Sequence, residues 1–115
     1  MEIINLPKLL TDNPEATFHS FHEFNGRAFG AVDITGSSPV WEMHPDTDEF
    51  FYIIEGELEF DLAESDAITH HVAPAGSTFV IPKGLWHKVS AEKGVKVLYF
   101  TPGESLHSDA DDPRS

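Results

Sequence analysis

The chain has 115 residues, of which 40% are hydrophobic and 11% aromatic, and these values are typical of one globular domain rather than of a disordered segment. Acidic residues outnumber basic residues 20 to 7, and the resulting net charge of -13 argues against nucleic acid as a partner, because such a surface repels phosphate groups. The absence of cysteine excludes disulfides and thiolate metal sites, so any metal ion must be held by imidazole and carboxylate groups.

The N-terminal sequence gives no sign of export or membrane insertion. Residues 1–5 lack the basic start and the long apolar run of a signal peptide. No apolar stretch approaches the roughly 20 residues that span a bilayer. We therefore expect no membrane partner and a cytoplasmic location.

The first residues leave two structures open. Residues 3–10 are mostly apolar, and either an edge strand or a short helix after Pro7 fits them. After a turn, residues 16–24 alternate only in part and predict a strand. Asn25-Gly26 is a tight-turn dipeptide, so residues 27–35 are expected to pair back on that strand as a hairpin.

Short runs separated by Gly, Pro and polar residues continue through the chain. The strands expected after the first hairpin cover residues 40–44, 50–55, 57–62, 68–72, 78–81, 85–90 and 95–100. The run 50–55 is nearly all apolar and predicts a strand buried on both faces that Gly56 ends. Residues 57–62 alternate, which predicts that Leu58, Phe60 and Leu62 point inward.

The pattern of short strands without a long helical period predicts an all-β barrel or sandwich. We expect a single domain over residues 1–115, with its core at about residues 16–101. Residues 103–115 are polar and acidic, and they are expected to form a frayed, flexible tail.

Two stretches concentrate residues that can bind a metal. Glu42 and His44 are two residues apart on a strand-like run, so they share one face, and Glu49 can reach them across a turn. The stretch from Gly76 to His87 supplies another histidine at the end of an apolar run. We expect His87 to reach the site from the opposite sheet.

These spacings resemble the two motifs of the cupin superfamily. In the first motif, a glycine is followed after five residues by His-x-His, then by a glutamate and a second glycine. Gly36, His44, Glu49 and Gly56 match this order, and Glu42 stands where the first histidine is usual.

The second motif is a glycine, then Pro-x-Gly after five residues, then a histidine two residues later. Gly76, Pro82, Gly84 and His87 fall in place, whereas Ala91 replaces the asparagine that is usual three residues after the histidine. The resemblance covers about residues 31–100.

The resemblance implies a double-stranded β-helix, or jelly-roll barrel, whose mouth holds a divalent metal ion. The implied metal ligands are Glu42, His44, Glu49 and His87. The candidate ions are Mn, Fe, Ni and Zn, and the oxygen donors would favour Mn, Fe or even Mg and Ca over Cu and Ni. Two imidazoles and two carboxylates would balance a divalent charge completely. The implied function is a metal-dependent enzyme, of the oxygenase or isomerase type, that acts on a small molecule.

Alternatives remain open for the ligands. Glu42 can be a solvated residue on the outer face, although His44 would then also point outward. If Glu42 lies in the site without binding metal, His44, Glu49 and His87 form the two-histidine, one-carboxylate arrangement of non-haem iron, and Glu42 is the catalytic acid or base. The two histidines can also be hydrogen-bonded residues at a barrel rim.

Alternatives also remain open for the function. One is a non-catalytic domain that senses, stores or binds a small ligand or a metal. Another is a metal-free lyase or dehydratase that uses Glu42 and a histidine as an acid–base pair. The candidate substrate contacts are His22, Phe51 and Trp86, although for the two aromatics a place in the core or in a dimer contact is favoured over a substrate contact.

The remaining histidines are weaker candidates. His19 and His22 lie on opposite faces of their strand, so at most one of them points into the barrel. His70 and His71 are expected near the surface, and His107 is left out because it falls in the tail. The apolar N-terminal run, which so small a barrel has little room to bury, predicts a homodimer.

Overall fold

The computed structural model describes residues 1–13 and 19–114. Within these residues, one short helix precedes eight strands: α1 (Leu6–Asp12), β1 (His19–Phe24), β2 (Arg27–Ser37), β3 (Trp41–Met43), β4 (Glu49–Ala63), β5 (Ile68–Pro74), β6 (Thr78–Ile81), β7 (His87–Phe100) and β8 (Leu106–Ser108). The predicted all-β fold is confirmed, and each run expected as a strand from residue 19 onward overlaps an observed strand. The runs 50–55 and 57–62 form one strand, β4, and the runs 85–90 and 95–100 form another, β7, so the prediction of separate strands is wrong in both cases. The part of the first expected strand at residues 16–18 lies outside the described residues.

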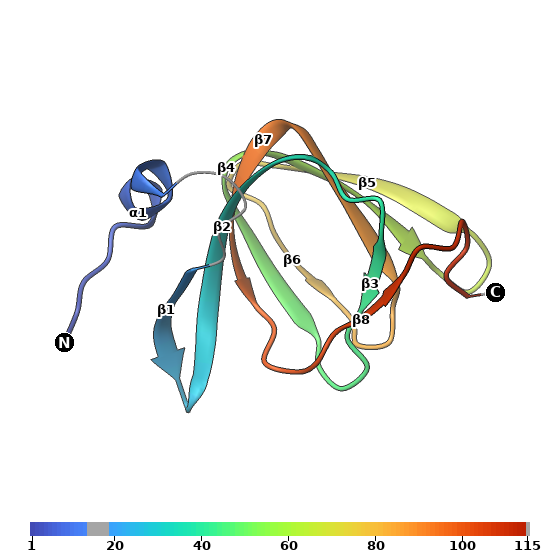
Figure 1. Ribbon diagram of the computed structural model, residues 1–115, viewed down its shortest axis with the longest axis horizontal. Helices are drawn as coiled ribbons and strands as arrows, with labels where there is room; N and C mark the ends of the chain where they lie inside the picture. The colour runs from blue at the N-terminus through green and yellow to red at the C-terminus, as the bar shows by residue number, and fades with distance from the viewer. Residues whose placement is uncertain (14–18, 115) are drawn as a thin grey trace.

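The strands form one antiparallel sheet that curls into a barrel (Figure 1). β7 lies at its centre, because β4 pairs with one edge of β7 while β2 and β3 pair with the other. β4 in turn pairs with β6 along its first half and with β5 along its second half. The C-terminal β8 pairs with the outer edge of β3.

Alternating side chains fill the barrel. Leu58, Phe60 and Leu62 are buried, as their alternation predicts, and they join one apolar core. Other core members are Val32, Phe51, Ile53, Ala73, Ile81, Ala91, Val95 and Val97. The run 50–55 does not fit its prediction, since Phe51 and Ile53 are buried but Tyr52 is 38% exposed. β4 therefore buries one face, and its other face is the outer surface of the barrel.

Gly56 does not end the strand, contrary to the sequence prediction. β4 continues to Ala63, and the pairing with β7 shifts register on either side of Gly56. Gly56 has a φ of 82° and lies so close to the opposite backbone that an added Cβ would be 2.3 Å from the Gly94 carbonyl oxygen. The glycine therefore bends a continuous strand and lets two backbones approach, as in a β-bulge.

The N-terminal region settles the choice between strand and helix. Asn5 caps α1 by accepting a hydrogen bond from the Lys8 amide at 2.9 Å, and Pro7 lies in the first turn. Leu10 is fully buried, whereas Ile3 is 87% exposed. The tight turn at Asn25-Gly26 is confirmed, because both residues have positive φ and join β1 to β2.

The tail differs from its prediction. The sequence predicts fraying from Gly103 onward, but Leu106–Ser108 form β8 and pair with β3. Further on, Pro113 is buried and the Arg114 side chain donates a hydrogen bond to the Glu64 carbonyl. Among the described residues, no helix is long and apolar enough to cross a membrane.

Candidate metal centre

The site is built where β3 meets β7. Glu42 and His87 are direct partners in the register of these strands, and side chains of opposed residues emerge on the same face. His44 follows one residue after β3, and Glu49 begins β4. His87 therefore comes from the adjacent strand, and the expectation that it lies on the opposite sheet is wrong.

A turn before β7 holds the two sequence motifs together. The Gly84 amide donates a hydrogen bond to the His44 carbonyl at 2.8 Å, and the Lys83 amide donates to Asp48 Oδ1 at 3.0 Å. Gly84 has a φ of 80°, which a residue with a Cβ rarely adopts. The residues between Pro82 and His87 thus form a turn, and this turn is hydrogen-bonded to the segment that carries His44.

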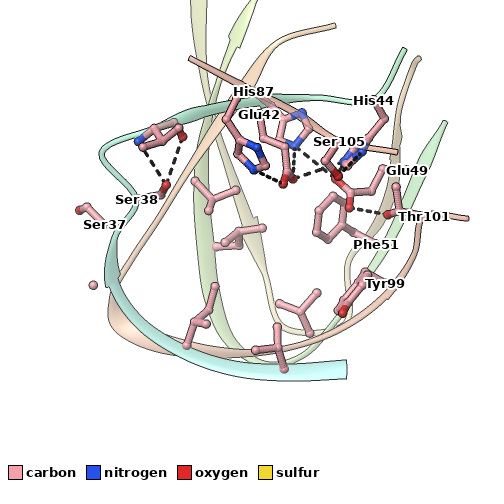
Figure 2. A pocket seen from close by; sticks show the side chains of 18 of the residues that line it. Ser37, Ser38, Glu42, His44, Glu49, Phe51, His87, Tyr99, Thr101 and Ser105 are labelled. Atoms are coloured by element: carbon pink, nitrogen blue, oxygen red, sulfur yellow. Dashed lines mark hydrogen bonds and ion pairs between the residues drawn. The ribbon is translucent and has the colours of Figure 1, made fainter. Parts of the chain in front are cut away.

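Glu42, His44, Glu49 and His87, termed here the ligand cluster, point their polar atoms at one another, as Figure 2 shows. One atom of each residue lies within 4.8 Å of the others. The Nε2 atoms of His44 and His87 are 3.2–3.3 Å from Glu42 Oε1 and from Glu49 Oε1. Donor atoms about 2.0–2.2 Å from one cation lie roughly 3 Å apart, so these separations are compatible with four ligands around one metal ion.

The outer nitrogens of both histidines fix the orientation of the rings. His44 Nδ1 lies 3.2 Å from the Glu104 carbonyl oxygen, and His87 Nδ1 lies 3.3 Å from the Leu85 carbonyl oxygen. Since a carbonyl can only accept, each neutral ring carries its proton on Nδ1 and turns the Nε2 lone pair into the cluster. This is the tautomer that histidine uses when Nε2 binds a metal.

Burial tests whether a metal fits the ligand cluster. His44 is 5% exposed, Glu49 is 6% exposed and His87 is 2% exposed. His44 Nε2 and Glu49 Oε1 are buried without a hydrogen-bond partner among the described residues, although they face each other at 3.3 Å. Leaving such atoms unsatisfied is costly, and a shared cation satisfies both. The cluster therefore fits a divalent metal ion bound by nitrogen and oxygen.

Charge attraction dominates the cluster when it holds no metal. Burial disfavours the charged forms, but the contacts with Glu42 and Glu49 outweigh it and raise the pKa of His44 to about 10 and that of His87 to about 9. Burial likewise raises the pKa of both carboxyls, and the contacts with the histidines reverse this and bring the pKa of Glu42 and of Glu49 below its usual range.

Supporting residues that the two sequence motifs do not indicate lie in the segment Thr101–Ser108, termed here the C-terminal segment. Thr101 Oγ1 donates to Glu49 Oε2, and Ser105 Oγ lies 3.1 Å from His44 Nδ1. His107 stands opposite Glu42 in the β3–β8 register, with its Nε2 3.2 Å from Glu42 Oε2. Glu42 thus directs one oxygen at the cluster and the other at His107. Continued alternation past Tyr99 could have indicated Thr101, but no local signal marks His107.

The ligand cluster lies at one end of a cavity of about 490 Å³. Figure 2 shows Thr101 and Ser105 beside the ligand cluster, Ser37 and Ser38 at another side of the cavity, and several side chains drawn in carbon alone below the cluster. The apolar side chains that line the cavity, termed here the apolar wall, are those of Val32, Ile34, Val40, Phe51, Leu58, Val89 and Val97. Such a volume is typical of a small-molecule site.

The three candidate substrate contacts are placed differently. Phe51 lines the cavity, and Figure 2 shows its ring beside the cluster. His22 is exposed on β1, and Trp86 is half-buried next to His87; neither is among the cavity-lining residues. His70 is exposed and contacts Asp61 at 2.7 Å, while His71 stacks on Phe60.

Comparison with known proteins gives one consistent result. Residues 31–101 match the sequence pattern of the Cupin domain family. The chain is 33% identical to a cupin-2 domain-containing protein from Shewanella frigidimarina NCIMB 400, whose crystal structure matches with a TM-score of 0.75 over 87% of this chain and 94% of that one.

Two further matches are more limited. The chain is 35% identical over 69 residues to the uncharacterized protein YdbB of Bacillus subtilis (strain 168); the match covers 60% of this chain and 58% of YdbB, so the chain spans little more than half of that relative. Hydroquinone 1,2-dioxygenase from Sphingomonas sp. TTNP3, with 4-hydroxybenzoate bound, matches with a TM-score of 0.69 at 16% identity, over 87% of this chain and 79% of that one. The identity to the dioxygenase is low, so that match shows a common fold alone.

The contact between His107 and Glu42 gives a first prediction. Replacing His107 with alanine frees Glu42 Oε2, so we expect the affinity for Zn²⁺ to fall about 10- to 100-fold, as is usual when a group that orients a metal ligand is lost. Competition with a chelator measures the affinity. His107→Gln keeps a donor and should restore most of the affinity, and His70→Ala should leave it unchanged. An unaltered affinity in His107→Ala would contradict this role.

The raised histidine pKa values predict how stability depends on pH in chelator-treated protein. Histidine in the unfolded chain has a pKa of about 6.5, so the contribution of the charged rings is complete below that pH and is lost as pH rises through 9 and 10. We expect the unfolding temperature to fall between about pH 6.5 and pH 10. The double variant His44→Gln/His87→Gln should show a flatter profile. Equal slopes of unfolding temperature against pH in the wild type and the double variant would show that these two histidines do not cause the pH dependence.

Proposed function

Because the chain belongs to the Cupin domain family, we propose that it binds one divalent metal ion through the ligand cluster and acts as a metal-dependent enzyme on a small molecule in the cavity. The observation that carries this proposal is the convergence of two histidine Nε2 atoms and two carboxylate oxygens, with each Nδ1 held by a backbone carbonyl. Oxygenase and isomerase reactions are the types that suit such a site. The nitrogen and oxygen donors suit Mn, Fe, Ni or Zn.

The residues around the cluster would have separate tasks. A divalent ion held there would supply Lewis acidity toward an oxygen of the substrate. Glu42 is the most exposed cluster member, with 35% of its side chain accessible, so it is the carboxylate that can exchange a proton with a molecule in the cavity. His107 holds Glu42 from the other side, and Thr101 holds Glu49. Phe51 and the rest of the apolar wall keep water from the bound molecule.

A metal-free acid–base enzyme is the second candidate. The two histidines and two carboxylates compensate one another in charge at 3.2–3.3 Å, so the cluster is balanced even without a cation. Glu42 and a histidine would then move the proton in a lyase or dehydratase reaction. A binding or sensor domain without turnover would use the same cavity. Metal content and turnover separate these candidates.

Metal analysis of the purified protein tests the leading proposal. We expect about one equivalent of a divalent transition metal per chain, since four convergent nitrogen and oxygen ligands form one complete site. His44→Ala and His87→Ala should each lose it, because each removes a ligand. Mass spectrometry of the element content gives the stoichiometry. His70→Ala is the matched control, because His70 lies outside the cavity, and it should keep the metal. A metal-free wild type after growth in metal-rich medium would favour the acid–base candidate.

We also propose that the protein forms a homodimer, although the surface that supports this differs from the predicted one. Leu10 of the N-terminal run is buried in its own chain. On the outer face, however, Tyr52 of β4 and Val80 of β6 are 38% and 53% exposed, and Phe24 of the β1–β2 hairpin is 61% exposed. Cytoplasmic location stays a prediction.

Light scattering at micromolar concentration tests the dimer. We expect twice the mass of the chain for the wild type and a monomer for Val80→Glu, because a buried unpaired charge opposes association. Glu57→Gln, on another exposed part of β4, serves as the control. A monomeric wild type would exclude this dimer.

A further inference from the structure

The charge of the cavity limits what it can hold. The titratable side chains that line it are Glu42, Glu49, His44, His87, His107 and Tyr99. None of the described residues lining the cavity is a lysine or an arginine. A negatively charged ligand would thus find two carboxylates and no permanently cationic side chain.

A bound metal would not change this balance. Two neutral imidazoles and two carboxylates cancel the charge of a divalent ion, so the loaded cluster has no net positive charge left for an anion. A histidine at position 42 would leave one positive charge. The chain as a whole carries a net charge of -13, which further disfavours the approach of anions.

The shape and chemistry of the cavity add a second limit. The apolar wall supplies much of the lining outside the ligand cluster, and four of its members, Val32, Phe51, Leu58 and Val97, belong to the buried core. Hydroxyl groups occur among the lining residues near the cluster, on Thr101 and Ser105. Thr35, Ser37 and Ser38 add further hydroxyl groups to the lining, so a ligand that fits this cavity has an apolar body and an uncharged polar group.

We propose that the cavity binds small uncharged molecules with an apolar or aromatic body and a hydroxyl group, in preference to carboxylates of the same size, and that Glu42 sets this preference. The proposal deepens the proposed function, because it assigns the ligand class of the same site. Glu42 acts as a specificity-determining residue through its charge. A carboxylate ligand would lose its hydration in the cavity without gaining a counter-charge.

Benzyl alcohol and benzoate provide a matched pair of probes, because both have a phenyl ring and only benzoate is charged at neutral pH. Each is titrated into isotope-labelled, Zn²⁺-loaded protein, and the amide signals of Val32, Phe51 and Tyr99 report binding in the cavity. We expect benzyl alcohol to bind at least about tenfold more tightly than benzoate. The difference in binding free energy that corresponds to this ratio is a modest fraction of the interaction energy of one close charge pair. Equal or tighter binding of benzoate, or binding of neither probe at millimolar concentration, would overturn the proposal.

Two variants isolate the charge. Glu42→His keeps a metal ligand and adds one unit of positive charge, so benzoate should bind about tenfold more tightly to this variant than to the wild type. Glu57→His makes the same substitution at an exposed position outside the cavity and should leave both affinities unchanged. If the ratio of the benzyl alcohol affinity to the benzoate affinity is the same in Glu42→His as in the wild type, Glu42 does not set the preference.

The same titrations distinguish a failure of the ligand-class proposal from a failure of the proposal that the cluster binds a metal. If the protein binds no Zn²⁺, the metal proposal fails, and the same titration of the metal-free protein still compares the two probes. If Zn²⁺ binds and benzoate is preferred, the metal proposal stands and the ligand class is wrong.

Discussion

The pairing of β4 with β7 is the constraint on which the rest of the structure depends. These two strands stay hydrogen-bonded from Phe50 opposite Phe100 to Leu62 opposite His87, and they bend together where Gly56 meets Gly94. Because the two strands bend, their inward-facing side chains line the core and the strands also curve around it to form the barrel. It also brings the start of β7 beside β3, so that His87 faces Glu42. The core and the ligand cluster are therefore two results of the same pairing.

Residues outside the ligand cluster fix the orientation of the cluster side chains. Backbone carbonyls of Glu104 and Leu85 orient the two histidines, and the C-terminal segment supplies a partner for Glu49 and another for Glu42. Most of these contacts come from residues that lie far along the chain from the motifs. A site with fixed ligands loses little entropy on binding a metal, and this preorganisation is what distinguishes a metal site from a chance group of polar residues.

The replacement of histidine by glutamate at position 42 links the structure to function. A divalent ion bound by the cluster would be neutralised completely, and the cluster carboxylate that is substantially exposed lines the cavity. Neutral cavities with an apolar wall favour uncharged molecules, because an anion pays for its lost hydration without compensation. The fold of this family supports many reactions, so chemistry of this kind must be argued from individual residues rather than from the barrel.

The sequence by itself determined the all-β class, most of the strands and the four cluster residues, because alternation and motif spacing are local properties of the chain. It also determined which face of residues 57–62 is buried. Only the tertiary structure decided that Gly56 bends one strand rather than dividing two, since this requires the backbone of Gly94 beside it. In the same way, the role of His107 depends on β8 pairing with β3, which places it opposite Glu42 across 65 residues of chain. The two faces of a single strand produce an alternating pattern in the sequence, whereas contacts between distant strands produce no periodic pattern.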